Sequence, residues 1–137
     1  MFSNLFESTT IPMLQEAVNF AQSRHTVLAG NIANMDTPGY QIRDLSVEDF
    51  QSRLKGAIEA RRRPQLPISP GDLAERSTGP FGQISKNPKT VTRHDKNNIG
   101  MEFQVTEMVK NQMQHNLALA VMNSQFQLLQ AAISERV

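Results

Sequence analysis

The sequence contains no cysteine among its 137 residues. A disulfide framework, a thiolate metal site and a thiol nucleophile are therefore excluded. The first residues, MFSNLFESTTIPM, carry no lysine or arginine ahead of their apolar side chains, unlike a Sec-type signal peptide. No stretch approaches the roughly 18 uninterrupted apolar residues of a membrane span. If this protein leaves the cytoplasm, we expect a different exporter to carry it.

Groups of residues that perform catalysis are also missing. The sequence has no phosphate-binding glycine loop, no paired carboxylates and no nucleophile motif. His94 beside Asp95 resembles a base with its orienting partner, but no nucleophile accompanies them. His25 and His115 lack the nearby carboxylate or cysteine that would complete a metal site. We therefore predict a non-enzyme with no catalytic residue, metal, cofactor or small-molecule substrate.

Positive charge is concentrated in the middle of the chain. Residues 51–96 carry ten basic and four acidic side chains, whereas the whole chain is close to neutral. A run of arginines, Arg61 to Arg63, would suit phosphate contacts. A basic helical adaptor that binds nucleic acid or an acidic protein through these arginines is the alternative to a structural protein. No zinc finger, RNP motif or interleaved aromatic residue supports it, so we expect no nucleic-acid partner.

Two long segments have the alternating three- and four-residue spacing of a helical heptad seam. The first seam comprises Ile11, Leu14, Val18, Ala21, His25, Leu28, Ile32 and Met35. The second comprises Met101, Val105, Met108, Gln112, His115, Leu119, Met122, Phe126, Leu129 and Ile133. Thr10 suits the N-cap of the first helix. Pro38-Gly39 suits the centre of a type II turn, so the helix should stop near Met35 or Asp36.

Between the seams, the sequence predicts one short helix and a long irregular connector. The helix has Ser46 as its N-cap. Its narrow apolar face comprises Val47, Phe50, Leu54 and Ile58. Residues 64–96 hold five of the seven prolines, and only KTVTRH in this range favours a strand. The chain thus divides into an N-terminal helix and turn (1–45), a short helix with a basic connector (46–96) and a C-terminal helix (97–137).

The two seams can pair if the chain folds back on itself. The expected fold is then mainly α, with the terminal helices packed as an antiparallel, coiled-coil-like hairpin. One register pairs residues whose numbers add to 140 and sets His25 opposite His115; a slide of seven residues matches the seams again. Apolar residues off the seams need other partners: Phe20, Val27, Val109, Met113, Leu117, Val121 and Leu128. Because a hairpin alone is marginal, these positions predict self-assembly into a layer of helices.

The first helix closes with LAGNIANMDTPGYQ, which resembles the signature of the bacterial flagellar axial proteins, L-A-x-N-[IL]-A-N-x-x-T-P-G-[YF]. The matching positions are Leu28, Ala29, Asn31, Ile32, Ala33, Asn34, Thr37, Pro38, Gly39 and Tyr40. This family comprises rod, hook and hook-associated subunits. Within it, the chain is most similar to a short proximal-rod subunit that carries an Asn-Asn pair at the position of Asn97 and Asn98. The other short rod subunit carries a Ser-Arg-Ala-Tyr-Glu-Ala-Asn-like stretch, which this chain lacks.

The resemblance implies a structural subunit of the proximal rod in the flagellar basal body, which transmits torque across the periplasm. It implies export by the flagellar type III apparatus without signal cleavage. The implied partners are other copies of the chain, other rod subunits, the MS ring with its rod adaptor, and the export apparatus. The implied assembly motif comprises Asn31, Asn34, Thr37, Pro38, Gly39 and Tyr40, a joint that ends a packed helix and turns the chain outward. The implied helix seam comprises Leu14, Val18, Leu28, Ile32, Val105, Met108, Leu119, Met122, Phe126 and Leu129.

Overall fold

The computed structural model describes residues 9–62, 84, 89–92 and 100–134. These ranges form helices α2 (Ile11–Ala33), α3 (Val47–Arg62) and α4 (Met101–Ser134), with strands β1 (Arg43–Leu45) and β2 (Thr90–Thr92). The prediction of a mainly helical chain whose long first and last helices pack together is confirmed. Most of the predicted connector (64–96), including His94, lies outside the described residues, as do Arg63, Asn97 and Asn98.

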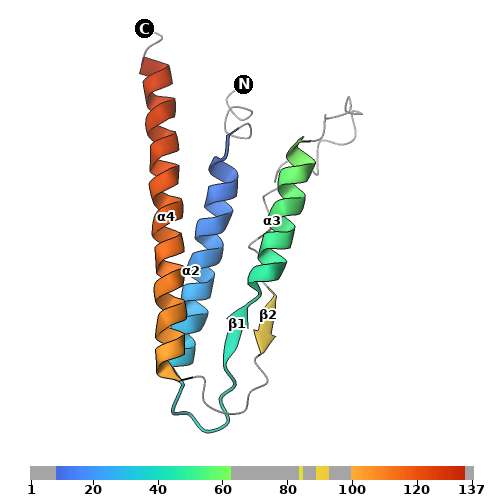
Figure 1. The fold of residues 1–137 in the computed structure, drawn as a ribbon, viewed down its shortest axis with the longest axis vertical. Helices are drawn as coiled ribbons and strands as arrows, with labels where there is room; N and C mark the ends of the chain where they lie inside the picture. Colours follow the sequence, from blue (N-terminus) through green and yellow to red (C-terminus); the bar gives the residue numbers. More distant parts are fainter. Residues whose placement is uncertain (1–8, 63–83, 85–88, 93–99, 135–137) are drawn as a thin grey trace.

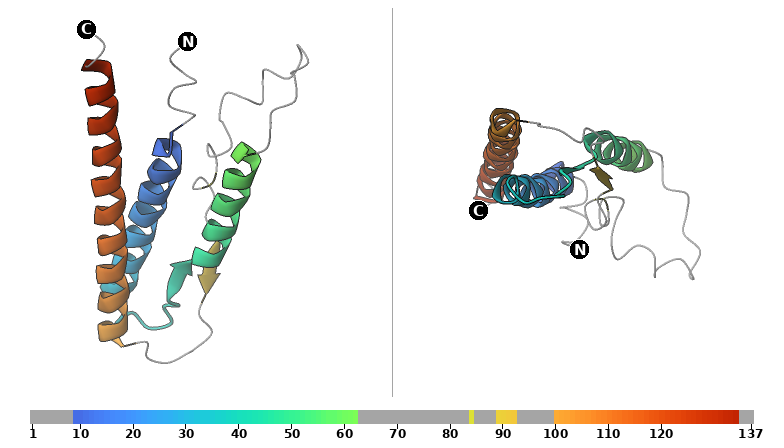
Figure 2. Two further views of the ribbon diagram at one scale, coloured as in Figure 1. Left: turned by 45° about the horizontal axis from the view of Figure 1, so that its top comes forward. Right: turned by 90° about the horizontal axis from the view of Figure 1, so that it is seen from below.

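Helices α2 and α4 run antiparallel, and α2 lies between α4 and α3 (Figures 1 and 2). The lengths of 34 residues for α4 and 23 for α2 correspond to about 51 and 35 Å. The C-terminal end of α4 therefore extends beyond the start of α2 (Figure 1). This arrangement leaves the outer face of α4, opposite α2, without a neighbouring helix in the described part of the chain.

The start and end of α2 follow from its flanking residues. Thr10 is the N-cap residue as predicted, but its side chain makes no capping bond. Instead the Ile11 backbone N–H donates to the hydroxyl of Thr9 at 3.3 Å. The helix ends at Ala33 with Asn34 as C-cap, slightly before the predicted Met35 or Asp36. The sequence thus located both ends of the helix to within a few residues.

The register of the hairpin differs from the predicted one. Three contacts join the two helices: Asn31 Nδ2 to Gln104 Oε1 at 3.4 Å, Arg24 Nη2 to Glu107 Oε2 at 2.9 Å, and Asn111 Nδ2 to the Ala21 carbonyl at 2.7 Å. The residue numbers in these pairs add to between 131 and 135, not 140. Helix α4 is therefore displaced by about one heptad, roughly 10 Å along its axis. His25 and His115 do not face each other, and Nδ1 of each is buried without a hydrogen-bond partner among the described residues.

Each helix also turns a slightly different face inward than its predicted seam. The buried stripe of α2 consists of Ala21, Arg24, Leu28 and Asn31, each 6% exposed or less. On α4, Gln104 and Asn111 are buried, whereas the adjacent residues Val105 and Gln112, which were predicted to lie in the seam, are exposed. Val105 and Phe126, both expected in the seam, are 44% and 45% exposed in the single chain. The polar side chains at these inward positions form hydrogen bonds between the two helices. These bonds avoid the free-energy cost of burying polar groups without partners.

Helix α3 begins as predicted, with the Asp49 backbone N–H donating to the Ser46 hydroxyl at 3.1 Å. Its apolar face meets α2 where the rings of Phe20 and Phe50 stack with their centroids 4.0 Å apart. A small cluster lies along the same face, formed by Met13, Phe50, Leu54, Ala57, Ile58 and Ile84. The predicted strand within KTVTRH is present as β2, which pairs antiparallel with β1. Strand β1 was not predicted.

Few apolar side chains are buried for a chain of this length. Among the described residues they are Ile11, Phe20, Ala21, Leu28, Leu45, Ala57 and Ile84. A globular domain of similar size buries about two thirds of its surface in one continuous core. The buried groups of the described residues instead form two narrow strips on either side of α2.

Candidate functional site

The end of α2 is a compact series of turns that reverses the chain. Asn34 caps the helix through its backbone N–H and its side-chain Nδ2, which donate to the Gly30 carbonyl at 3.1 and 2.8 Å. The Tyr40 backbone N–H donates to the Thr37 carbonyl at 3.1 Å. Gly39 lies between them with φ of 78°, which is the value that the third residue of a type II turn requires. The predicted type II turn is confirmed.

Asn31 fastens the chain after this turn back onto α2. Its side chain is fully buried. Its amide both donates to and accepts from the backbone of Arg43, as a residue on a paired strand would. Oδ1 accepts the Arg43 N–H at 3.2 Å, and Nδ2 donates to the Arg43 carbonyl at 2.6 Å. The Tyr40 hydroxyl donates to the same Oδ1 at 3.1 Å, while Nδ2 also reaches Gln104 on α4. One amide therefore binds the helix, the turn, β1 and α4 together.

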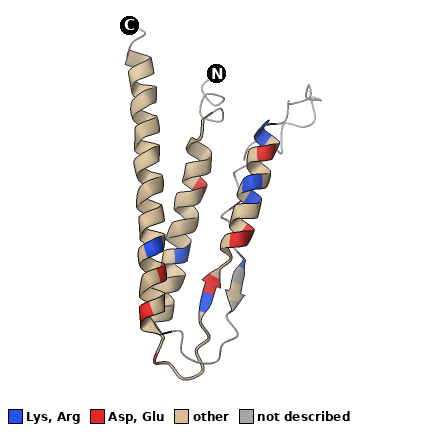
Figure 3. Ribbon diagram, viewed as in Figure 1, with Lys and Arg blue, Asp and Glu red and all other residues tan. Residues whose placement is uncertain are grey.

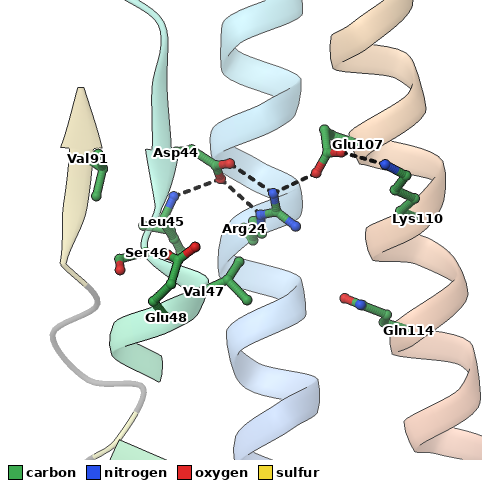
Figure 4. A pocket seen from close by; sticks show the side chains of 10 residues that line it. All are labelled: Arg24, Asp44, Leu45, Ser46, Val47, Glu48, Val91, Glu107, Lys110 and Gln114. Atoms are coloured by element: carbon green, nitrogen blue, oxygen red, sulfur yellow. Dashed lines mark hydrogen bonds and ion pairs between the residues drawn. The ribbon is translucent and has the colours of Figure 1, made fainter. Parts of the chain in front are cut away.

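About two turns of α2 before Asn31, a buried arginine joins α2, β1 and α4 by charge. Arg24 donates from Nε and Nη2 to the two carboxylate oxygens of Asp44 at 2.9 and 2.8 Å. Nη2 also donates to Glu107 on α4 at 2.9 Å, and Glu107 in turn accepts from Lys110 at 2.9 Å. Asp44 Oδ1 accepts the Leu45 backbone N–H as well. Figure 4 shows Arg24 held between the carboxylates of β1 and α4.

A hollow of about 460 Å³ opens beside this ion-pair network. It is lined by Arg24, Asp44, Leu45, Ser46, Val47, Glu48, Val91, Glu107, Lys110 and Gln114 (Figure 4). Both cations of the lining are already paired with carboxylates. Nowhere in the described part of the chain do three potential ligands among His, Cys, Asp and Glu gather to hold a metal ion.

The network shifts the ionisation of its members in the direction expected for paired charges. The hydrogen bond from Lys110 lowers the pKa of Glu107, burial opposes this effect, and Arg24 lowers the pKa further. The hydrogen bond to Asp44 is the main cause that raises the pKa of Arg24. Since the Lys110 side chain is 62% exposed and that of Arg24 only 8%, we regard Arg24 as the structurally decisive partner of Glu107.

This lowered pKa predicts how stability depends on pH. A carboxylate with a depressed folded pKa stabilises the protein above its ordinary pKa, about 4.3, and the contribution disappears as pH falls through the folded value. In urea unfolding, Glu107→Gln should therefore be less stable than the parent at pH 7, and the difference should narrow below about pH 4. Glu59→Gln, at an exposed site on α3, is the matched control. A difference for Glu107→Gln that stays constant down to pH 3 would contradict this prediction.

The predicted site residues are found in two environments. Asn31 is buried and Asn34 is half-buried, whereas Thr37, Pro38, Gly39 and Tyr40 are exposed at the end of the hairpin. Leu28 is buried in the α2 stripe, and the remaining predicted seam positions apart from Val105 and Phe126 are half-buried: Leu14, Val18, Ile32, Met108, Leu119, Met122 and Leu129. Their role in assembly stays a prediction.

Sequence reasoning missed the polar members of the interface. Arg24 and Asn31 lie seven residues apart on α2, as do Gln104 and Asn111 on α4, with Glu107 between the latter two. A seven-residue spacing of polar side chains beside an apolar seam was the available signal. Polar residues at helix positions next to a seam usually face solvent, so this spacing alone does not predict that these side chains are buried.

Comparisons with known proteins point to a single family over most of the chain. A model of the family described as flagella basal body rod protein matches residues 13–41, which cover most of α2 and the turn. The flagellar basal body rod protein FlgB of Escherichia coli K12 is 32% identical over 117 residues, covering 81% of this chain and 83% of that protein. FlgB of Proteus mirabilis is 28% identical, with 92% and 94% covered, and FlgB of Bacillus subtilis is 25% identical, with 93% and 95% covered.

Within the described residues, no helix combines the length and the apolar character that crossing a membrane requires. The signature that ends α2, the paired terminal helices and the similarity over four fifths of the sequence agree with one another. The chain belongs to the FlgB family of flagellar basal body rod proteins, which are structural proteins and not enzymes.

Proposed function

We propose that this chain is a subunit of the proximal rod and assembles with copies of itself and other rod subunits through its terminal helices. The observation that carries the proposal is the α4 stripe, defined here as Val105, Val109, Met113, Leu117 and Val121. Each of these side chains is between 39% and 69% exposed. Residues four apart are neighbours on the surface of a helix, so these side chains form a continuous apolar ridge that winds gradually around α4. Such a surface on a single chain marks a site of association.

The distribution of charge supports packing against identical neighbours. Residues 111–134 contain no Asp, Glu, Lys or Arg, and Figure 3 shows this part of α4 without charge. When identical helices lie side by side, equivalent residues come close together, and like charges there would cost several kcal/mol. A charge-free helix avoids this repulsion.

The proposed location and partners follow from the family. The chain would lie in the periplasmic part of the basal body, contact the MS ring through its rod adaptor, and transmit torque through packed helices. It would reach this place through the flagellar type III export apparatus, without a cleaved signal. The narrow core and the lack of disulfides suit passage as an unfolded chain, because few interactions have to be broken first.

In the basic cluster on α3, Arg53 and Arg61 make contacts inside the chain, whereas Arg62 is exposed, so the cluster gives little support to the alternative of a nucleic-acid or acidic-protein adaptor. Arg53 forms an ion pair with Asp49 at 3.0 Å, one turn earlier on the same helix. Arg61 donates to the Thr9 carbonyl at 2.7 Å and so helps to fix α3 beside the start of α2. These two cations make contacts within the chain, and Arg63 lies outside the described residues.

Sedimentation velocity and circular dichroism of the purified chain test the proposal. We expect the sedimentation coefficient and the helical signal to rise with concentration or on addition of other rod subunits, because association buries the α4 stripe. Duplex DNA at moderate salt should leave both unchanged. A folded monomer that binds DNA tightly, with an affinity that falls steeply with salt, would establish the adaptor instead.

A further inference from the structure

The apolar contacts between α2 and α4 do not by themselves define how far along each other the helices lie. Both predicted seams repeat every seven residues, so a slide of one heptad exchanges one set of apolar contacts for a similar set. The register that pairs numbers adding to 140 is such a slide from the observed one. Something other than apolar spacing must select the observed register.

A slide to that register would change which side chains of α4 lie opposite the polar residues of α2. Asn111 would take the place of Gln104 and could still reach Asn31. Gln114, however, would take the place of Glu107, and the charge opposite Arg24 would be lost. Ala118 would take the place of Asn111, so the hydrogen bond to the Ala21 carbonyl would be lost as well. Only two of the three polar contacts therefore distinguish the registers.

We propose that Glu107 and Asn111 are the register-determining residues of this subunit, through the contacts of Glu107 with Arg24 and of Asn111 with the Ala21 carbonyl. Both donors of these contacts are buried, since Arg24 is 6% exposed and Asn111 2% exposed. A buried polar side chain that loses its partner destabilises the fold, and a buried charge that loses its partner destabilises it more. Buried polar residues are known to fix register in helical coiled coils at the expense of some stability.

The register matters for the arrangement of the whole subunit. Asp44 and the turn are fixed to α2 through Arg24 and Asn31, so the register sets the height of α4 relative to them. A slide of one heptad would shift the α4 stripe by about 10 Å relative to the turn and α3. Subunits with mixed registers would present their apolar stripes at different heights to their neighbours.

A transfer experiment tests the assignment. The triple variant Glu107→Gln, Gln114→Glu, Ala118→Asn moves the glutamate one heptad further along α4 and adds a second asparagine there, while Asn111 is kept because it would take the place of Gln104 in the slid register. In the slid register, Arg24 would again meet a glutamate and the Ala21 carbonyl would again meet an asparagine. Because the chain has no cysteine, spin labels can be attached at introduced cysteines replacing Gln22 on α2 and Asn123 on α4, both exposed. Dilution with excess unlabelled chain restricts the measured distances to pairs within one chain.

We expect a single distance in the parent and a distance shorter by up to about 10 Å in the triple variant, since residue 123 takes the place of residue 116. Glu107→Gln alone should keep the parent distance, because sliding would give Arg24 only another glutamine. An unchanged distance in a folded triple variant would overturn the assignment. If that variant does not fold, the double variant Gln114→Glu, Ala118→Asn decides, because it offers Arg24 and the Ala21 carbonyl the same partners in both registers. Two distances in this variant would support the assignment, and a single distance would contradict it. The readout lies inside one chain, so its failure would leave the proposed rod function untouched.

Discussion

Replacing Arg24 with methionine should lower the free energy of unfolding by about 3–5 kcal/mol, the range seen when one partner of a buried ion pair is removed. The side chains of Asp44 and Glu107 are only 14% and 15% exposed, so both carboxylates would lose their main compensating charge. Methionine replaces the aliphatic stem of the arginine and suits a helix, which limits other effects. For a protein of this size, we expect a thermal midpoint lower by roughly 10 °C.

A matched control separates burial from charge. Lys110→Met removes the other cation bound to Glu107, but this side chain is 62% exposed and its pair should contribute less than about 1 kcal/mol. Arg24→Lys keeps the charge and loses the two-pronged contact with Asp44, so it should fall between these variants. If Arg24→Met proved no more destabilising than Lys110→Met, the three-element junction would not depend on Arg24.

The helices were predictable from sequence because their signals are local. Apolar residues at alternating steps of three and four extend through both α2 and α4, Ser46 caps α3, and Pro38-Gly39 can form few turns other than the observed one. Strand β1 carries no such signal. It has three residues, and its conformation depends on the Asn31 amide and on pairing with β2, which is far away in sequence.

The candidate site was predictable only in part, for the same reason. Asn31 and Tyr40 were found through the family signature, but the signature gave no indication that their side chains bind each other. Arg24 and Glu107 are separated by 83 positions, and each looks like an ordinary surface residue in its own helix. Seams that repeat every heptad leave the register open, so the pairing of these two residues could not be read from spacing alone.

Introducing two glutamates into the α4 stripe, as Met113→Glu with Leu117→Glu, should abolish association while leaving the single chain folded. These side chains are 69% and 65% exposed, so little packing inside the chain is lost, and glutamate suits a helix. Burying each of them in a contact contributes about 1.5–3 kcal/mol. Losing both should weaken each contact at least a hundredfold, since 1.4 kcal/mol corresponds to a factor of ten. Sedimentation velocity should then report a monomer with the parent's helical signal.

The control for this variant adds the same charge at the same spacing on an adjacent face. Gln112 and Asn116 are exposed, bond to each other at 3.0 Å and lie outside the α4 stripe. Gln112→Glu with Asn116→Glu should therefore weaken association less, whereas Met113→Leu with Leu117→Met should preserve it because the apolar area remains. In a strain that lacks this protein, only the stripe variant with glutamates should fail to restore swimming. Equal loss from both glutamate pairs would mean that added charge anywhere on α4 blocks assembly, and the apolar stripe would then have no special role.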